Sequence, residues 1–143
     1  MNKLCIVIGF LLTALSSHAY DEPVERVIDV RNLVIKHPLP GKWRTVAYLE
    51  ISNEGKVSDK LVSVEADWAE IVEVHTHEIR DGVMSMYEIA ELEIPSNDRI
   101  VFESGGYHLM IYKLFKERPD NPMMKFCFEN SGCIHVKGLW EYF

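Results

Sequence analysis

The 143-residue sequence lacks any concentration of basic residues that would suit a nucleic-acid partner. It has 15 Lys and Arg residues against 22 Asp and Glu residues, which gives a formal net charge of −7. No run of Lys or Arg occurs anywhere along the chain. Because contact with a phosphate backbone needs clustered positive charge, we expect no nucleic-acid partner.

The chain also lacks the short motifs that mark many nucleotide-binding and acyl-transfer sites. The P-loop, the dinucleotide glycine fingerprint and the nucleophile elbow are all absent. Asp67, Glu70 and Glu73 precede His75, but no nucleophile pattern accompanies them. We interpret these acidic residues as a solvated face, and we predict that the protein is not an enzyme.

Long hydrophobic runs are missing except at the N-terminus. Lys3 supplies a positive charge before an apolar run at 4–15, which is too short to span a membrane as a stable helix. Ser17 and Ala19 put small residues at the two positions that a signal peptidase inspects. We therefore predict a signal peptide at 1–19 and a single mature domain at 20–143.

The predicted leader also sets the expected location of the protein. A lipoprotein would need a cysteine at the end of the apolar run, whereas Cys5 lies inside it. We therefore expect a periplasmic protein with no stable membrane insertion after cleavage.

Cysteine is scarce, and only Cys127 and Cys133 remain after the predicted cleavage. Their spacing brackets a turn, so the pair either closes a disulfide across a hairpin or stays reduced, and both states remain open. Disulfides persist in the oxidising space outside the cytoplasm. A stretch of five intervening residues is not a usual thiolate clamp, which disfavours a metal role for this pair.

Helical periodicity is absent over long windows. Apolar residues instead recur with period two and in short β-branched runs, separated by turn residues such as Asp81-Gly82. Only 67–70 would accommodate a helical turn. Eight or nine short strands with such turns predict an all-β sandwich or a small barrel. The predicted strands are 27–35, 45–52, 60–65, 71–79, 83–91, 99–103, 107–114, 124–129 and 133–140.

The distinctive feature is a collection of histidines and methionines in the centre of the chain. Every methionine after Met1 lies at Met84 or beyond, and three histidines fall in the same central stretch. Because side chains alternate along a strand, these residues form pairs that share a face. The pairs are His75 with His77, Met84 with Met86, and His108 with Met110.

A two-residue turn at Asp81-Gly82 would fix how the first two of these strands pair. It sets His77 opposite Met86. His75 then lies diagonal to Met86 on the same face, within reach of a shared ion.

The chemistry of these groups indicates which metal they would bind. Imidazole and thioether groups form a neutral, soft set of ligands that selects Cu(I) over Zn(II), Mg(II) and Ca(II). Thioethers do not titrate in the working pH range and cannot be trapped as a disulfide. The sequence therefore predicts Cu(I) as the bound metal.

The spacing of four of these residues resembles the motif of the PCu(A)C family of periplasmic copper chaperones. That motif is a His, ten residues, a Met, twenty-one residues and then His-x-Met, and the sequence matches it without a gap at His75, Met86, His108 and Met110. Flanking segments such as Gly82-Val83-Met84-Ser85-Met86 are also similar, and the resemblance covers nearly the whole mature chain.

The resemblance implies a cupredoxin-like β-sandwich with Greek-key topology. It also implies that one Cu(I) is delivered to the copper centres of a respiratory oxidase, either directly to an oxidase subunit or through a Sco-type protein. The implied ligands are His75, Met86, His108 and Met110, with His77 and Met84 as secondary candidates. With His75 as a ligand, we interpret His77 as a transfer residue that replaces a ligand while copper passes to a partner.

Other functions remain open. A blue-copper electron carrier needs a thiolate, two His and a weak axial Met, and only Cys133-Ile134-His135 approaches that arrangement. A copper mono-oxygenase with an N-terminal His would require cleavage before His18, which places Leu15 where a small residue is needed. A metal-free β-sandwich interaction module would use the same Met and His residues to line an apolar surface.

Overall fold

The computed structural model describes residues 27–143, and the predicted signal peptide lies outside the described residues. All of the regular secondary structure in the described range is β-strand. No helix within 27–143 has the length and hydrophobicity needed to cross a membrane. The strands are β1 (Ile28–Lys36), β2 (Arg44–Asn53), β3 (Asp59–Glu65), β4 (Ala69–Arg80), β5 (Val83–Ile89), β6 (Leu92–Ile94), β7 (Asp98–Phe102), β8 (His108–Leu114), β9 (Met123–Phe128), β10 (Gly132–Lys137) and β11 (Leu139–Glu141).

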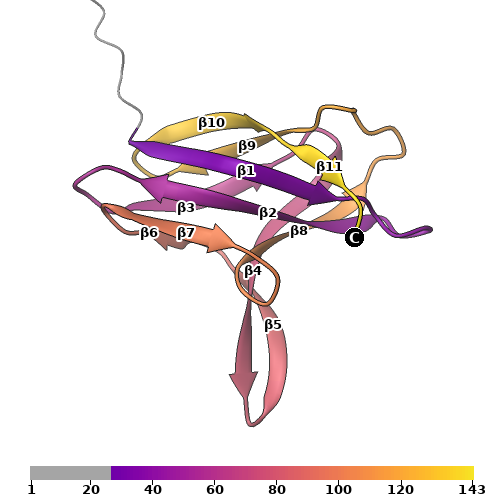
Figure 1. Ribbon diagram of the computed structural model, residues 1–143, viewed down its shortest axis with the longest axis horizontal. Coiled ribbons are helices and arrows are strands. Elements are labelled where there is room, and N and C mark those ends of the chain that lie inside the picture. The colour runs from indigo at the N-terminus through magenta and orange to yellow at the C-terminus, as the bar shows by residue number, and fades with distance from the viewer. Residues whose placement is uncertain (1–26) are drawn as a thin grey trace, which may run out of the picture.

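The strands form two layers (Figure 1). One sheet has seven strands in the order β11-β1-β2-β8-β4-β5, with β7 also paired to β2, and the other has four in the order β10-β9-β3-β6. The strands pair antiparallel, except that β1 and β11 run parallel. The predicted all-β sandwich is confirmed.

The core lies between the two sheets and follows from the alternation along the strands. In β2, Ala47, Leu49 and Ile51 are almost fully buried, while the residues between them are half-buried. Met124 and Phe126 of β9, in the other sheet, belong to the same apolar cluster. A shift of one residue would turn every inward side chain to solvent, so burial of this face fixes the strand register. That register also fixes the outer face, where the predicted ligands lie.

The described residues contain eleven strands in place of eight or nine, because one predicted strand is divided and one short strand, β6, was not predicted. The predicted strand 83–91 ends at Ile89, and β6 follows it as a separate strand that pairs with β3 in the other sheet. The predicted strand 133–140 divides at Gly138, where an added Cβ would lie 2.8 Å from Cδ1 of Ile35. At both places the chain passes from one sheet to the other.

The segment 67–70, where the sequence would accommodate a helical turn, contains no helix in the structure. Asp67 and Trp68 form a non-helical turn, and β4 begins at Ala69. The backbone amide of Ala69 donates to the carbonyl oxygen of Ala66 at 3.3 Å, which closes this turn, and Ala69 then pairs with Leu114 of β8.

The end of the β4–β5 hairpin projects from the sandwich as an arm, which we define as residues 76–87 (Figure 1). β4 pairs with β8 only as far as His75, so beyond this point β5 is its sole partner strand. Asp81 and Gly82 have φ of 52° and 77°, as a two-residue type I′ turn requires. The predicted turn and the predicted pairing of His77 with Met86 are therefore confirmed.

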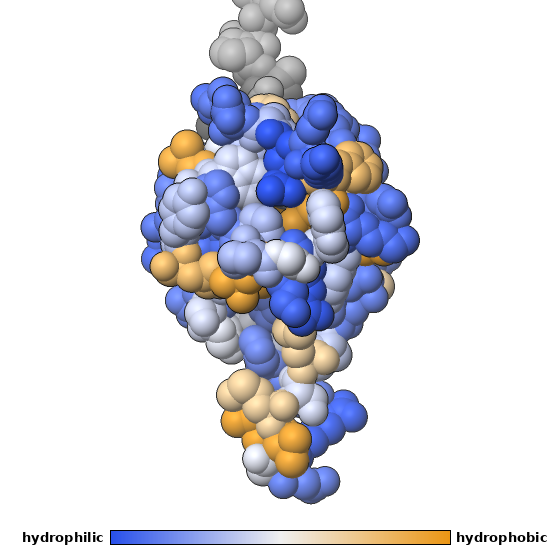
Figure 2. All heavy atoms as spheres, turned by 90° about the vertical axis from the view of Figure 1, so that its right-hand side faces the viewer, coloured by the Kyte–Doolittle hydropathy of each residue, from blue (hydrophilic) through white to orange (hydrophobic). Residues whose placement is uncertain are grey.

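The arm carries exposed apolar side chains rather than core residues. Figure 2 shows hydrophobic side chains gathered over this projection, at the bottom of the view. The exposed large hydrophobic residues of the arm are Ile79, Val83, Met84, Met86 and Tyr87.

One buried carboxylate holds the turn between β9 and β10. Asp59, which is 4% exposed, accepts hydrogen bonds from the backbone amides of Asn130 and Ser131 at 3.0 and 2.9 Å and from the Ser131 hydroxyl at 2.6 Å. In the same hairpin, Cys127 and Cys133 form a disulfide between paired positions of the two strands. Of the two states that the sequence left open for this cysteine pair, the structure contains the disulfide.

The carboxylate of Asp59 makes stability depend on pH. Burial by itself raises the pKa of Asp59, but hydrogen bonds from Ser131, Asn130 and Lys60 outweigh burial and bring the pKa below its ordinary value of 3.8. The pKa is thus depressed in the folded state. The stabilisation from this group is therefore complete above the ordinary pKa and is lost as pH falls through the folded value.

We expect Asp59→Asn to lower the free energy of unfolding at pH 7 by about 1–3 kcal/mol, because donors are left poorly paired in a buried turn. The variant should also lose less stability than the wild type when the pH falls below about 4. Urea unfolding at a series of pH values measures both effects. A stability difference that stays constant from neutral to acid pH would contradict this origin.

Candidate metal centre

Two of the predicted ligands, His75 and His108, lie directly opposite each other at the base of the arm. They are paired between β4 and β8, and their ring centroids are 6.0 Å apart. Their neighbours Val74 and Leu109 are also paired and belong to the core. Because side chains alternate, the register that buries Val74 and Leu109 turns both imidazoles to the opposite face of the sheet.

His108 presents an unprotonated nitrogen to a thioether. Its Nδ1 lies 2.9 Å from the carbonyl oxygen of Gly106, which can only accept, so Nδ1 carries the hydrogen. Burial lowers the pKa of His108, which favours the neutral ring. The other nitrogen, Nε2, is then free of hydrogen and lies 3.0 Å from Sδ of Met86. Two lone-pair donors thus face the same space with no proton between them.

His75 is oriented by a carboxylate. Its Nε2 lies 2.8 Å from Oε2 of Glu73, and its buried Nδ1 has no hydrogen-bond partner among residues 27–143. His77, which is paired with Met86, also has a buried Nδ1 that meets no partner in the described part of the chain. Its ring centroid lies 5.1 Å from that of His108. A buried, unpaired polar atom costs about 1–3 kcal/mol unless a ligand satisfies it.

The remaining predicted ligands, Met110 and Met84, differ in burial and in their position along the strands. Met110 is 8% exposed and is paired with Glu73 across β8 and β4. It also lines a pocket of about 160 Å³ with Leu39 and Arg44, among other residues. Met84 is 62% exposed and lies nearer the tip of the arm.

The structure therefore brings several of the predicted ligands together. Imidazole and thioether groups meet at the base of the arm in His75, His77, His108 and Met86. Met110 lies two residues beyond His108 on β8. Within 27–143, no group of three or more His, Cys, Asp or Glu side chains is arranged to hold a metal ion. Met86 adds a soft thioether donor beside the imidazole of His108, and this mixed set suits Cu(I) better than Zn(II).

Glu73 is the residue of this site that the sequence interpretation missed. We read it as part of a solvated face, which is wrong, because it bonds to His75 and its side chain is 28% exposed. The signal was present in its position two residues before His75, which places both side chains on one strand face.

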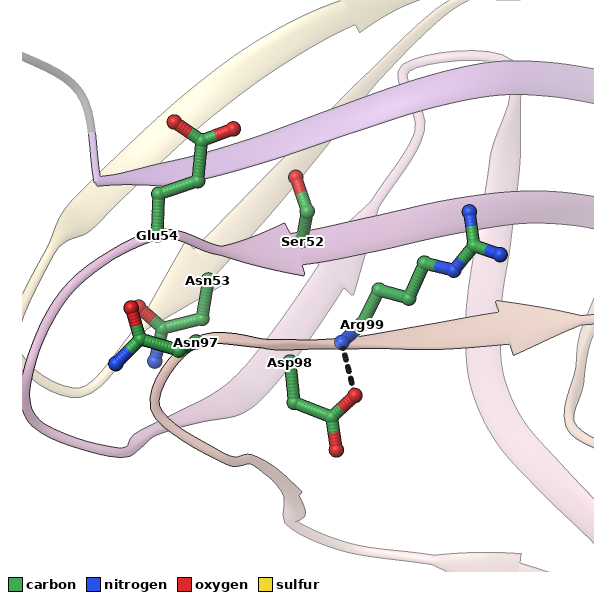
Figure 3. A pocket seen from close by; sticks show the side chains of 6 residues that line it. All are labelled: Ser52, Asn53, Glu54, Asn97, Asp98 and Arg99. Atoms are coloured by element: carbon green, nitrogen blue, oxygen red, sulfur yellow. Dashed lines mark hydrogen bonds between the residues drawn. The ribbon is translucent and has the colours of Figure 1, made fainter.

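A second, polar pocket lies away from these residues (Figure 3). Its side chains point in different directions, and the carboxylate of Asp98 accepts a hydrogen bond from the backbone amide of Arg99 at 2.7 Å. The buried Asn53 donates to the carbonyl oxygens of Val57 and Ile94. These contacts hold neighbouring turns together and leave no convergent set of free donors.

Known proteins resemble this chain in sequence pattern and in fold. The family described as "Putative lipoprotein LpqE-like" matches residues 28–138. No curated protein sequence matches. The solved structure of the copper-bound PCuAC domain from PmoF2 has a TM-score of 0.69 at 20% identity, and the alignment covers 81% of this chain and 93% of that domain.

Two further solved structures have the same fold. The apo PCuAC domain from PmoF1 has a TM-score of 0.67 at 19% identity, covering 81% of this chain and 94% of that one. The solution structure of the Cu(I) form of DR1885 from Deinococcus radiodurans has a TM-score of 0.59 at 19% identity, covering 77% of this chain and 75% of that one. The family match spans most of the described residues, and these structures share the cupredoxin-like architecture. The chain therefore belongs to the LpqE-like family, which is related to PCuAC domains, and it has the fold of a PCuAC domain.

Proposed function

We propose that the protein is a Cu(I)-binding metallochaperone that acts outside the cytoplasm. The observation that carries this proposal is the approach of Nε2 of His108 to Sδ of Met86, two unprotonated donors 3.0 Å apart. Nitrogen and thioether sulfur together favour a soft monovalent cation over Zn(II) or Mg(II). The copper-bound PCuAC structure and the Cu(I) form of DR1885 support the same proposal.

Four residues are the proposed ligands of one Cu(I), which is cargo rather than a resident cofactor. Met86 and His108 face one another, and His75 contributes the buried Nδ1, which has no partner among the residues that the structure describes. Met110 is the fourth, from the position that follows His108 on the same face of β8. Imidazole and thioether groups bind metal in their neutral forms, so this set includes no thiol that must be deprotonated.

The arm is the proposed route by which copper leaves. His77 lies directly opposite Met86 and would replace a ligand during transfer, while Met84 extends the line of thioethers toward the exposed tip. We propose that the receiving protein is an oxidase subunit or a Sco-type protein. The projection of the arm from the sandwich supports this role, since an acceptor can approach it without disturbing the core (Figure 1).

The location outside the cytoplasm is supported by two observations. The matching family is described as a lipoprotein family, and the described chain contains a disulfide between Cys127 and Cys133. Disulfides are rare in reducing cytosol and persist in the periplasm.

The alternatives are constrained by the same features. A blue-copper centre needs a free thiolate, whereas Cys127 and Cys133 are joined to each other. The exposed apolar residues of the arm favour a metal-free interaction module as the second candidate. Failure to bind copper would favour that module.

We expect the mature protein to bind one Cu(I) per chain, and to bind it more than about tenfold tighter than Zn(II), because the ligand set is soft and neutral. Anaerobic titration against a Cu(I) chelator of known affinity, with elemental analysis of the loaded protein, measures stoichiometry and affinity. Zinc competition under the same conditions supplies the comparison. Equal affinity for the two metals would refute the assigned ligand chemistry.

A further inference from the structure

His75 is held by a carboxylate that lies outside the four proposed ligands. The bond of 2.8 Å from Nε2 of His75 to Oε2 of Glu73 is the one hydrogen bond of this ring in the described chain. The side chain of His75 is only 10% exposed. Shielding from water makes such a bond stronger than an exposed one.

This bond determines which nitrogen of His75 is free. A carboxylate accepts hydrogen bonds, so Nε2 of His75 carries the hydrogen. A neutral imidazole has one N–H, which leaves the lone pair on the buried, unpartnered Nδ1. His108 has the opposite arrangement, with Nδ1 bonded to the carbonyl oxygen of Gly106 and Nε2 facing Met86.

We propose that Glu73 is a positioning residue that fixes His75 in its Nε2–H form, so that His75 binds Cu(I) through Nδ1 while His108 binds through Nε2. This inference rests on the proposed copper-binding function. A carboxylate that accepts from a ligating imidazole holds the ring in place and makes its free nitrogen more basic.

Glu88 provides a matched control. It is paired directly opposite His75 on β5, carries the same charge as Glu73 and is exposed. The ring of His75 nevertheless bonds to Glu73 and not to Glu88. A general electrostatic effect would therefore appear in variants of both acids, whereas control of the tautomer would appear only in variants of Glu73.

The test combines Cu(I) affinity with the protonation site of the ring. Glu73→Ala is expected to lower Cu(I) affinity by about 10- to 100-fold. Glu73→Gln should recover most of that loss, because its amide oxygen still accepts from Nε2–H, and Glu88→Ala should bind as the wild type does. Ring nitrogen-15 NMR of the copper-free protein should show His75 protonated at Nε2 in the wild type and in Glu73→Gln, and a mixture of tautomers in Glu73→Ala.

The outcomes separate this inference from the proposed function. If the wild type binds Cu(I) and Glu73→Ala binds it equally well, or if His75 of the wild type is protonated at Nδ1, the inference is overturned while the function stands. If the wild type binds no Cu(I), both are overturned. Should Glu73→Ala fail to fold, the tautomer of the wild type and the affinity of Glu73→Gln still decide.

Discussion

Replacing Met86 with alanine should weaken Cu(I) binding by about 100-fold or more. Removing a residue that only supports a metal ligand typically lowers metal affinity by about 10- to 100-fold, and removing a ligand itself should cost at least as much. Sδ of Met86 lies 3.0 Å from Nε2 of His108, which places this thioether in direct contact with a proposed ligand. The side chain is 46% exposed, so its removal leaves no closed cavity. Affinity should therefore fall without a comparable loss of stability in the copper-free protein.

Two other methionines supply the controls. Met123 is 41% exposed and lies on β9 of the other sheet, so Met123→Ala should leave affinity unchanged. Met84→Ala should have an effect smaller than about tenfold, because Met84 lies nearer the tip of the arm, where its proposed role is in transfer rather than in equilibrium binding. Anaerobic competition titration and far-ultraviolet circular dichroism measure affinity and folding. If Met86→Ala binds Cu(I) with the affinity of the wild type, Met86 is not a ligand.

The second large effect is expected at His75. His75→Ala should lower equilibrium Cu(I) affinity by about 100-fold, whereas His77→Ala should leave affinity nearly intact and slow the transfer of copper to an acceptor. The ring of His77 lies nearer His108 than that of His75 does, with centroid distances of 5.1 and 6.0 Å. His75 is nevertheless the proposed ligand, because its ring is held by Glu73 and its spacing from Met86 matches the motif.

Competition titration and stopped-flow transfer to a chelator distinguish these two roles. His135→Ala is a suitable control, since His135 is exposed and lies on β10 of the other sheet. If the two substitutions exchange their effects, His77 is the ligand and His75 the transfer residue.

The turn and the strand pairing of the arm could be predicted from local sequence alone. The turn at Asp81-Gly82 was predicted from residue type, because only a few residues adopt positive φ at both positions without strain. The pairing of His77 with Met86 followed from the turn by counting. Both are local features of a hairpin, so the sequence contains all that is needed to derive them.

The points at which the chain passes from one sheet to the other could not be predicted from local sequence. The break at Gly138 depends on the approach of Ile35, which belongs to a distant part of the chain. β6 is separate from β5 because it joins β3 in the other sheet. Period-two patterning reports which residues are buried but not which of two sheets buries them.

The sequence by itself determined the all-β class, the faces that the histidines and methionines share, and the donor chemistry, because these depend on side-chain type and strand alternation. Only the tertiary structure decided that His75 lies opposite His108, since β4 and β8 are brought together by burial of the core on their other face. It also decided that Glu73 bonds to His75 and that Nε2 of His108 faces Met86. Such contacts depend on orientations of side chains from separate strands, which a linear pattern does not encode.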